Sequence, residues 1–192
     1  MAAAIAGMTV CTSPAMAHDG TGLAGGFASG FYHPFTGMDH LLAMVAVGLW
    51  GAFLGRPLIY LLPVIFPLMM IGGAVLGMAG VPVPPMEIGI ALSVIGLGSC
   101  IALAWRAPVR VAVAVVALFA LFHGYAHGVE LPSAADPIGY STGFVLATGS
   151  LHVAGIGLGF LTARPGGMVV TRLLGCGIGM AGICFLCMAI GR

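Results

Sequence analysis

The chain is a succession of long apolar runs separated by short turn-forming segments. A helix that spans a membrane takes about 20 apolar residues, and five runs have this length: 58–80, 86–105, 109–131, 138–162 and 168–190. A sixth, shorter run covers 38–55. The segments between the runs contain Gly and Pro, as in GRP at 55–57 and GVPVPP at 80–85, which is typical of turns. The pattern therefore predicts six transmembrane helices.

A Gly-rich segment, TGLAGGFASGFYHPFTG at 21–37, precedes the first of these runs. Such a segment can extend the helix that follows, kink it, or form a re-entrant half-helix. The apolar pattern leaves these three alternatives open.

The N-terminal residues have the pattern of a cleaved signal. A short apolar stretch ends in Ala15-Met16-Ala17, the small-x-small pattern that signal peptidase cuts. We expect residues 1–17 to be a signal peptide and 18–192 to be a single membrane domain. The alternative is an uncleaved seventh span, which would be short and interrupted by Pro14.

The composition indicates that the chain lies in a lipid bilayer, and it also indicates the fold class. Hydrophobic residues make up 60% of the 192 residues and charged residues only 6%, whereas about a quarter of the residues of a soluble protein are charged. Helices satisfy their own backbone hydrogen bonds in lipid, and the 32 glycines allow close packing between them. We therefore expect an all-α integral membrane protein in contact with the lipid bilayer, with no nucleic-acid partner. The chain has no lysine, which excludes a Walker A motif and Schiff-base chemistry.

Charged residues alternate between the two ends of the predicted spans. With residue 18 outside and six spans following, five of the six arginines fall at cytoplasmic ends, as the positive-inside rule requires. These are Arg56, Arg106, Arg110, Arg164 and Arg172, while Asp19, Asp39, Glu87, Glu130 and Asp136 fall at external ends. The sixth, Arg192, is the C-terminal residue. Both mature termini are therefore expected outside.

The fourth span ends in the sequence FHGYAHGVE, which carries His123, His127 and Glu130. Positions i, i+4 and i+7 lie on one face of a helix. Ionisable groups within a membrane are costly, and they usually face a partner or a pathway. The alternative is that these residues lie in the wet interface, or that His127 only forms a hydrogen bond between helices.

The first span begins with a matching cluster, His33, Asp39 and His40, in the sequence HPFTGMDH. In the predicted topology both clusters lie at the external ends of their helices, so the two can converge on one cation. Imidazole together with carboxylate suits nickel, cobalt or zinc better than magnesium or calcium. The sequence therefore predicts a site for a divalent transition metal.

Some of these motif residues have simpler interpretations. Thr36 and Asp39 match the S/T-x-x-D/E capping box, so Asp39 could serve only the start of the helix. Pro34 and Gly37 are interpreted as determinants of shape. Four GxxxG pairs are interpreted as helix-packing motifs: Gly124/Gly128, Gly139/Gly143, Gly155/Gly159 and Gly175/Gly179.

Two further histidines are candidate secondary ligands. His152 lies near the middle of the fifth span, where it can be a deeper metal ligand or an interhelical hydrogen-bonding group. After cleavage at Ala17, the α-amine and imidazole of His18 would form a small chelate. Cys184 and Cys187 form a C-x-x-C pair, but the second pair that a zinc site requires is missing.

The motifs resemble those of the HupE/UreJ family of bacterial permeases. The resemblance rests on HPFTGMDHLLAM, FHGYAHGVE and the histidine in GSLHVAGIGLG. It implies a multi-pass inner-membrane permease, not an enzyme, that imports Ni²⁺ or, in some members, Co²⁺, often to supply hydrogenase or urease maturation proteins, and that holds no prosthetic group. The family motifs fall on His33, Pro34, Gly37, Asp39, His40, His123, Gly124, His127, Gly128 and Glu130.

Two other classes remain open at this stage. In an intramembrane zinc hydrolase, His123, His127 and His152 would hold zinc, with a carboxylate as general base. In a haem-binding cytochrome, histidines would be axial ligands, but axial pairs need ligands on opposite sides of a buried macrocycle. Clustering at one face disfavours the cytochrome.

The arginine distribution generates a first prediction, that both mature termini face the periplasm. A cysteine placed at the C-terminus should react with a membrane-impermeant thiol reagent in intact cells, because that end lies outside. A cysteine placed beside Arg106 should react only after the membrane is opened. Labelling in the reverse order would contradict the orientation and move both histidine clusters to the cytoplasmic side.

Overall fold

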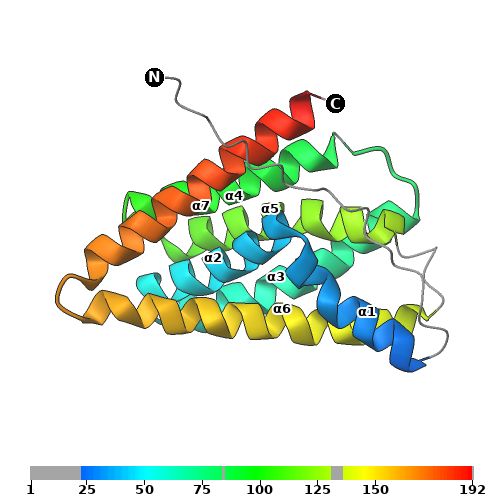
Figure 1. Cartoon of the computed structure of the whole chain (residues 1–192), viewed down its shortest axis with the longest axis horizontal. Coiled ribbons are helices and arrows are strands. Elements are labelled where there is room, and N and C mark those ends of the chain that lie inside the picture. The colour runs from blue at the N-terminus through cyan, green and yellow to red at the C-terminus, as the bar shows by residue number, and fades with distance from the viewer. Residues whose placement is uncertain (1–22, 84, 131–135, 192) are drawn as a thin grey trace, which may run out of the picture.

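A computed structural model of the chain describes residues 23–83, 85–130 and 136–191, and these residues fold into a bundle of helices (Figure 1). The predicted signal peptide and His18 lie outside the described residues. The helices are α1 (Leu23–Thr36), α2 (Met38–Leu54), α3 (Leu58–Met78), α4 (Met86–Ala102), α5 (Val109–Glu130), α6 (Pro137–Gly159), the 3-10 turn η2 (Phe160–Ala163) and α7 (Gly167–Ile190).

Each of the six apolar runs forms a helix whose ends lie within a few residues of the predicted ends. Length and composition make α3, α5, α6 with η2, and α7 candidate membrane spans, and α1 with α2 counts as a fifth if the bent pair crosses as one. The helix α4 is apolar but has only 17 residues. The structure thus supports a multi-pass, all-α membrane protein, with four to five candidate spans among the described residues. The count of six stays a prediction.

The Gly-rich segment before the first run forms a separate helix, α1, which is bent by 80° relative to α2. Gly37 joins the two in an extended conformation and has no side chain to cap α2. The capping-box interpretation is wrong, because the Thr36 hydroxyl donates back to the carbonyl of His33 at 2.8 Å. The Asp39 carboxylate instead accepts the backbone N–H of His40, in the first turn of α2, at 2.8 Å. The bend makes α1 and α2 a broken span or a re-entrant loop.

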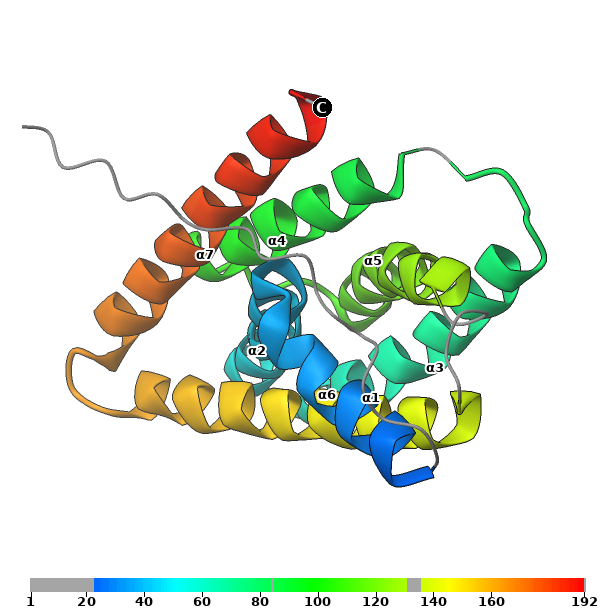
Figure 2. The same ribbon diagram turned by 45° about the vertical axis from the view of Figure 1, so that its right-hand side comes forward.

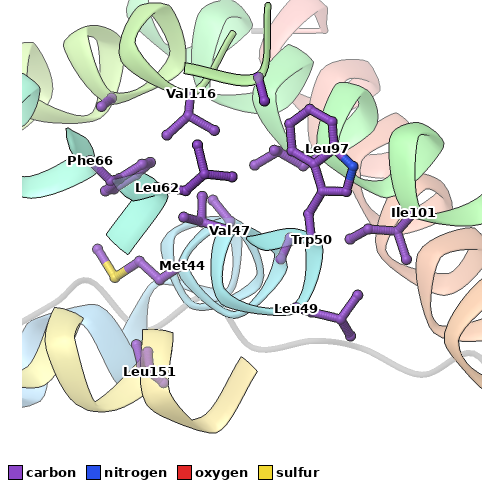
Figure 3. Packing of buried hydrophobic residues seen from close by; sticks show 14 of the residues in the cluster. Met44, Val47, Leu49, Trp50, Leu62, Phe66, Leu97, Ile101, Val116 and Leu151 are labelled. Carbon is purple, nitrogen blue, oxygen red and sulfur yellow. The ribbon is translucent and has the colours of Figure 1, made fainter. Parts of the chain in front are cut away.

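The helix α2 is the centre of the bundle. Ten of its 17 residues are buried, whereas an amphipathic helix at a surface would bury a single stripe. Figure 3 shows Val47 and Trp50 of α2 facing Leu62, Leu97 and other side chains from the surrounding helices. The N-terminal end of α2 carries Asp39 and His40, so this core fixes the position of the first histidine cluster.

Glycines let the backbones of neighbouring helices touch. A methyl group at Gly124 or Gly128 of α5 would overlap the carbonyl of Met70 or Ala74 in α3. Figure 2 shows α3 and α5 side by side, as do the contacts between them. The packing interpretation of Gly124 and Gly128 is confirmed. Pro34 is buried inside α1, which agrees with its interpretation as a determinant of shape.

This packing generates a matched pair of variants in α6. A methyl at Gly155 would overlap the carbonyl of Val45 in α2, whereas a methyl at Gly157 meets nothing within 4 Å. Gly155→Ala should therefore lower the free energy of unfolding by about 1–3 kcal/mol, the usual cost of overpacking. Gly157→Ala should leave it unchanged or raise it by up to ~1 kcal/mol through helix propensity. Thermal unfolding in detergent measures both, and equal stabilities would contradict the close approach of α2 and α6.

Candidate metal site

Four histidines from three helices meet at one end of the bundle. The ring of His40 in α2 lies 4.7 Å from that of His127 and 4.8 Å from that of His123, both in α5, centre to centre. His33, in the last turn of α1, lies 5.0 Å from His127 and 6.2 Å from His40. We call these four residues the outer histidine cluster. It unites the two motifs, which are more than 80 positions apart in the chain.

The α5 histidines are inside the protein. His123 is 0% exposed and His127 is 8% exposed, so the wet-interface interpretation is wrong for both. Glu130 is the last residue of α5, three positions beyond His127. Buried imidazoles require polar partners, and their partners define what the rings can bind.

Asp39 fixes the proton of His40. The Asp39 carboxylate accepts a hydrogen bond from Nδ1 of His40 at 2.9 Å and another from the His40 backbone N–H at 2.8 Å. In the neutral ring, Nε2 of His40 therefore carries the lone pair, and this nitrogen is buried with no hydrogen-bond partner in the described part of the chain. A carboxylate that orients an imidazole in this way is typical of metal-binding histidines. Gly37 leaves room for the pair, because a methyl there would lie 3.2 Å from the carboxylate oxygen.

Ser93 of α4 fixes the proton of His123. The Ser93 hydroxyl donates its hydrogen to the carbonyl of Ile90 at 2.6 Å, so its oxygen accepts from Nε2 of His123 at 2.8 Å. Nδ1 of His123 is then the unprotonated nitrogen, and it is also buried without a partner. His40 and His123 thus each have one buried ring nitrogen with no hydrogen-bond partner among the described residues.

A cavity of about 90 Å³ adjoins His127. It lies between α3, α5 and α6 and is lined by Met70, Tyr140 and Phe144 among others. The Phe144 ring packs 4.4 Å from that of His127. Since a water molecule takes about 30 Å³ in the liquid, this space is large enough to admit water.

His152 lies apart from the outer histidine cluster, in α6. Its ring hydrogen-bonds to the carbonyl of Pro63 in α3. That carbonyl lacks its usual helical donor because Pro67, four residues further on, has no N–H. The interhelical hydrogen bond proposed for His152 is therefore present. The same ring leaves Nε2 buried without a partner, as in His40 and His123.

The rings of the outer histidine cluster do not point at one centre. They pack edge to face or tilted, and among the described residues no three His, Cys, Asp or Glu side chains are placed so that they could hold a metal ion. Coordination by several of these rings would require side-chain rotation. The zinc-hydrolase alternative gains no support, because the ring contact found for His152 is with Phe66 at 5.5 Å.

Sequence reasoning missed the groups that orient the rings. Ser93 is one of two serines in the apolar helix α4, and a polar residue in such a run usually faces the bundle interior. The pair Pro63 and Pro67, spaced four apart, indicates a carbonyl without a donor. Both signals are present in the sequence, but neither identifies the histidine that uses them.

Comparison with known proteins agrees with the motifs. The family model described as HupE / UreJ protein matches residues 6–185. Protein HupE of Rhizobium leguminosarum bv. viciae is 45% identical over 174 residues, which cover 90% of this chain and 91% of that protein. No solved structure matches the chain.

Proposed function

Because the chain belongs to the HupE/UreJ family, we propose that it is a permease that imports Ni²⁺ or Co²⁺ across the bacterial inner membrane. The imported ion would supply the maturation of a hydrogenase or urease. One observation carries the proposal: buried imidazoles of α2 and α5 lie within 5 Å of each other, and their protons are fixed by Asp39 and Ser93.

The chemistry of the donors supports a late first-row divalent ion. Neutral imidazole nitrogens bind such ions well, while carboxylate oxygens add negative charge to the site. Asp39 and Ser93 each hold one ring nitrogen, of His40 and of His123, so the other nitrogen of each neutral ring has a lone pair for an ion. We propose His33, Asp39, His40, His123, His127 and Glu130 as the residues that bind or orient it.

The break between α1 and α2 supports an ion path. Broken helices occur at membrane depth where the chain lines a site or cavity, and their ends present unpaired backbone groups. Here the last turn of α1 carries His33 and the first turn of α2 carries Asp39. An ion that enters the cluster would draw these side chains together by rotation.

The membrane potential can drive the transport. A divalent cation that moves inward through about 100 mV gains ~4.6 kcal/mol, at ~2.3 kcal/mol per charge. The chain contains no Walker A motif, so ATP would have to act through a partner protein. We propose that the potential is sufficient.

The proposal predicts that ligands of one site act as a unit. In cells without other nickel importers, His40→Ala and His127→Ala should each reduce uptake of radiolabelled nickel at least about tenfold, and the double variant should add little, because one site is lost once. Cobalt and zinc as competitors define the selectivity. Thr142→Ala is the control, since Thr142 is exposed and its hydroxyl bonds only to its own helix.

Expression and membrane insertion of each variant are checked by immunoblotting. Wild-type nickel uptake by well-inserted His40→Ala and His127→Ala variants would show that these rings only pack the helices. Additive losses in the double variant would contradict a single shared site.

A further inference from the structure

Two buried polar atoms on α6 have no hydrogen-bond partner among the described residues: Nε2 of His152 and Oγ1 of Thr148. The residues are one turn apart on the same face, and their exposed fractions are 2% and 0%. A hydroxyl in a helix normally bonds to a carbonyl of the preceding turn. Thr142 and Ser150 of the same helix do so, at 2.8 and 2.6 Å, but Thr148 does not. This pair of unpartnered atoms therefore requires an explanation.

The hydrogen bond from His152 to the carbonyl of Pro63 accounts for only one of the two ring nitrogens. If the ring served only to satisfy the freed carbonyl of α3, its second nitrogen would be buried at a cost that an unpaired polar group always carries. An aliphatic residue would likewise fill the place of Thr148 without that cost. The chemical feature that the two atoms share is a lone pair on nitrogen or oxygen, which is what a divalent cation binds.

A single aromatic ring, that of Phe66, lies between His152 and His123 of the outer histidine cluster. The ring of Phe66 in α3 lies 5.5 Å from that of His152 and 5.5 Å from that of His123. Phe66 is a fully buried core residue, and Figure 3 shows it beside Leu62 and Val116 in the interior. The rings of His123 and His152 therefore flank one aromatic side chain. In each of the two rings one nitrogen is bonded to the protein, to Ser93 or to the carbonyl of Pro63.

We propose that His152 and Thr148 form an inner binding position for the transported divalent cation, which the ion occupies after it leaves the outer histidine cluster and passes Phe66. This inference rests on the proposed function. Two protein donors bind an ion more weakly than the outer cluster does, and passage requires a site from which the ion can leave. The inner position would thus limit the rate of transfer and not the affinity for external nickel.

His152→Asn tests the inner position. Asparagine keeps an amide N–H close to the place of Nδ1, so it can still donate to Pro63, but it has no atom that replaces the lone pair of Nε2. In proteoliposomes that contain the full chain, with radiolabelled Ni²⁺ and an imposed potential, the maximal rate should fall at least about tenfold while KM for nickel stays within about twofold. Thermal stability in detergent should stay close to that of the wild type. Ser150→Ala, on the exposed face of the same helix, should transport as the wild type does.

Thr148→Val provides a second variant should His152→Asn fail to insert. Valine has the shape of threonine and removes an unpartnered hydroxyl, so a purely structural Thr148 would tolerate it, whereas loss of a ligand should lower the maximal rate about threefold or more. Wild-type rates in the inserted variants would overturn the inner position while the proposed function stands. Absence of nickel uptake by the wild-type protein would overturn the proposed function and the inner position with it.

Discussion

A neutral imidazole has one proton, and the nitrogen to which the protein fixes that proton decides which nitrogen can bind a metal. Three buried histidines follow this constraint: His40 donates to Asp39, His123 to Ser93 and His152 to the carbonyl of Pro63. In each ring the opposite nitrogen is buried, and no described residue forms a hydrogen bond with it. These partners come from a carboxylate, a hydroxyl and a backbone carbonyl, so the common result does not depend on one repeated motif.

The backbone places the three rings by irregularities that a regular helix would not provide. The 80° bend at Gly37 brings the end of α1 to the start of α2. Pro67 frees the carbonyl that holds His152, because it has no N–H to donate. Glycines at the contacts of α3 with α5 and of α2 with α6 bring the backbones into contact, so the rings on these helices are close enough to meet. The glycines and the proline that shape the helix packing thus also place the histidine rings.

The sequence predicts the helices well, because the length of an apolar run reflects the thickness of the bilayer. It also predicts that His33 and His40 lie near His123 and His127, since in the predicted topology all four lie at the external ends of their spans. It does not predict the partners of those rings. Ser93 is 30 residues from His123, and Pro63 is 89 residues from His152, and no periodicity within a helix encodes contacts between helices. The ring orientations, which do not converge on one point, depend on rotamers that a sequence pattern cannot specify.

The central claim is that the protein fixes the tautomer of each buried ring so that a lone pair is ready for the ion. Nitrogen-15 NMR of histidine-labelled protein in lipid measures this directly, because protonated and unprotonated ring nitrogens have different chemical shifts. The chain has six histidines, and single replacements assign them. The account predicts neutral rings protonated at Nδ1 in His40 and His152 and at Nε2 in His123, with Ni²⁺ broadening the opposite nitrogens. Rings that exchange between tautomers, or nitrogens that Ni²⁺ leaves unchanged, would contradict it.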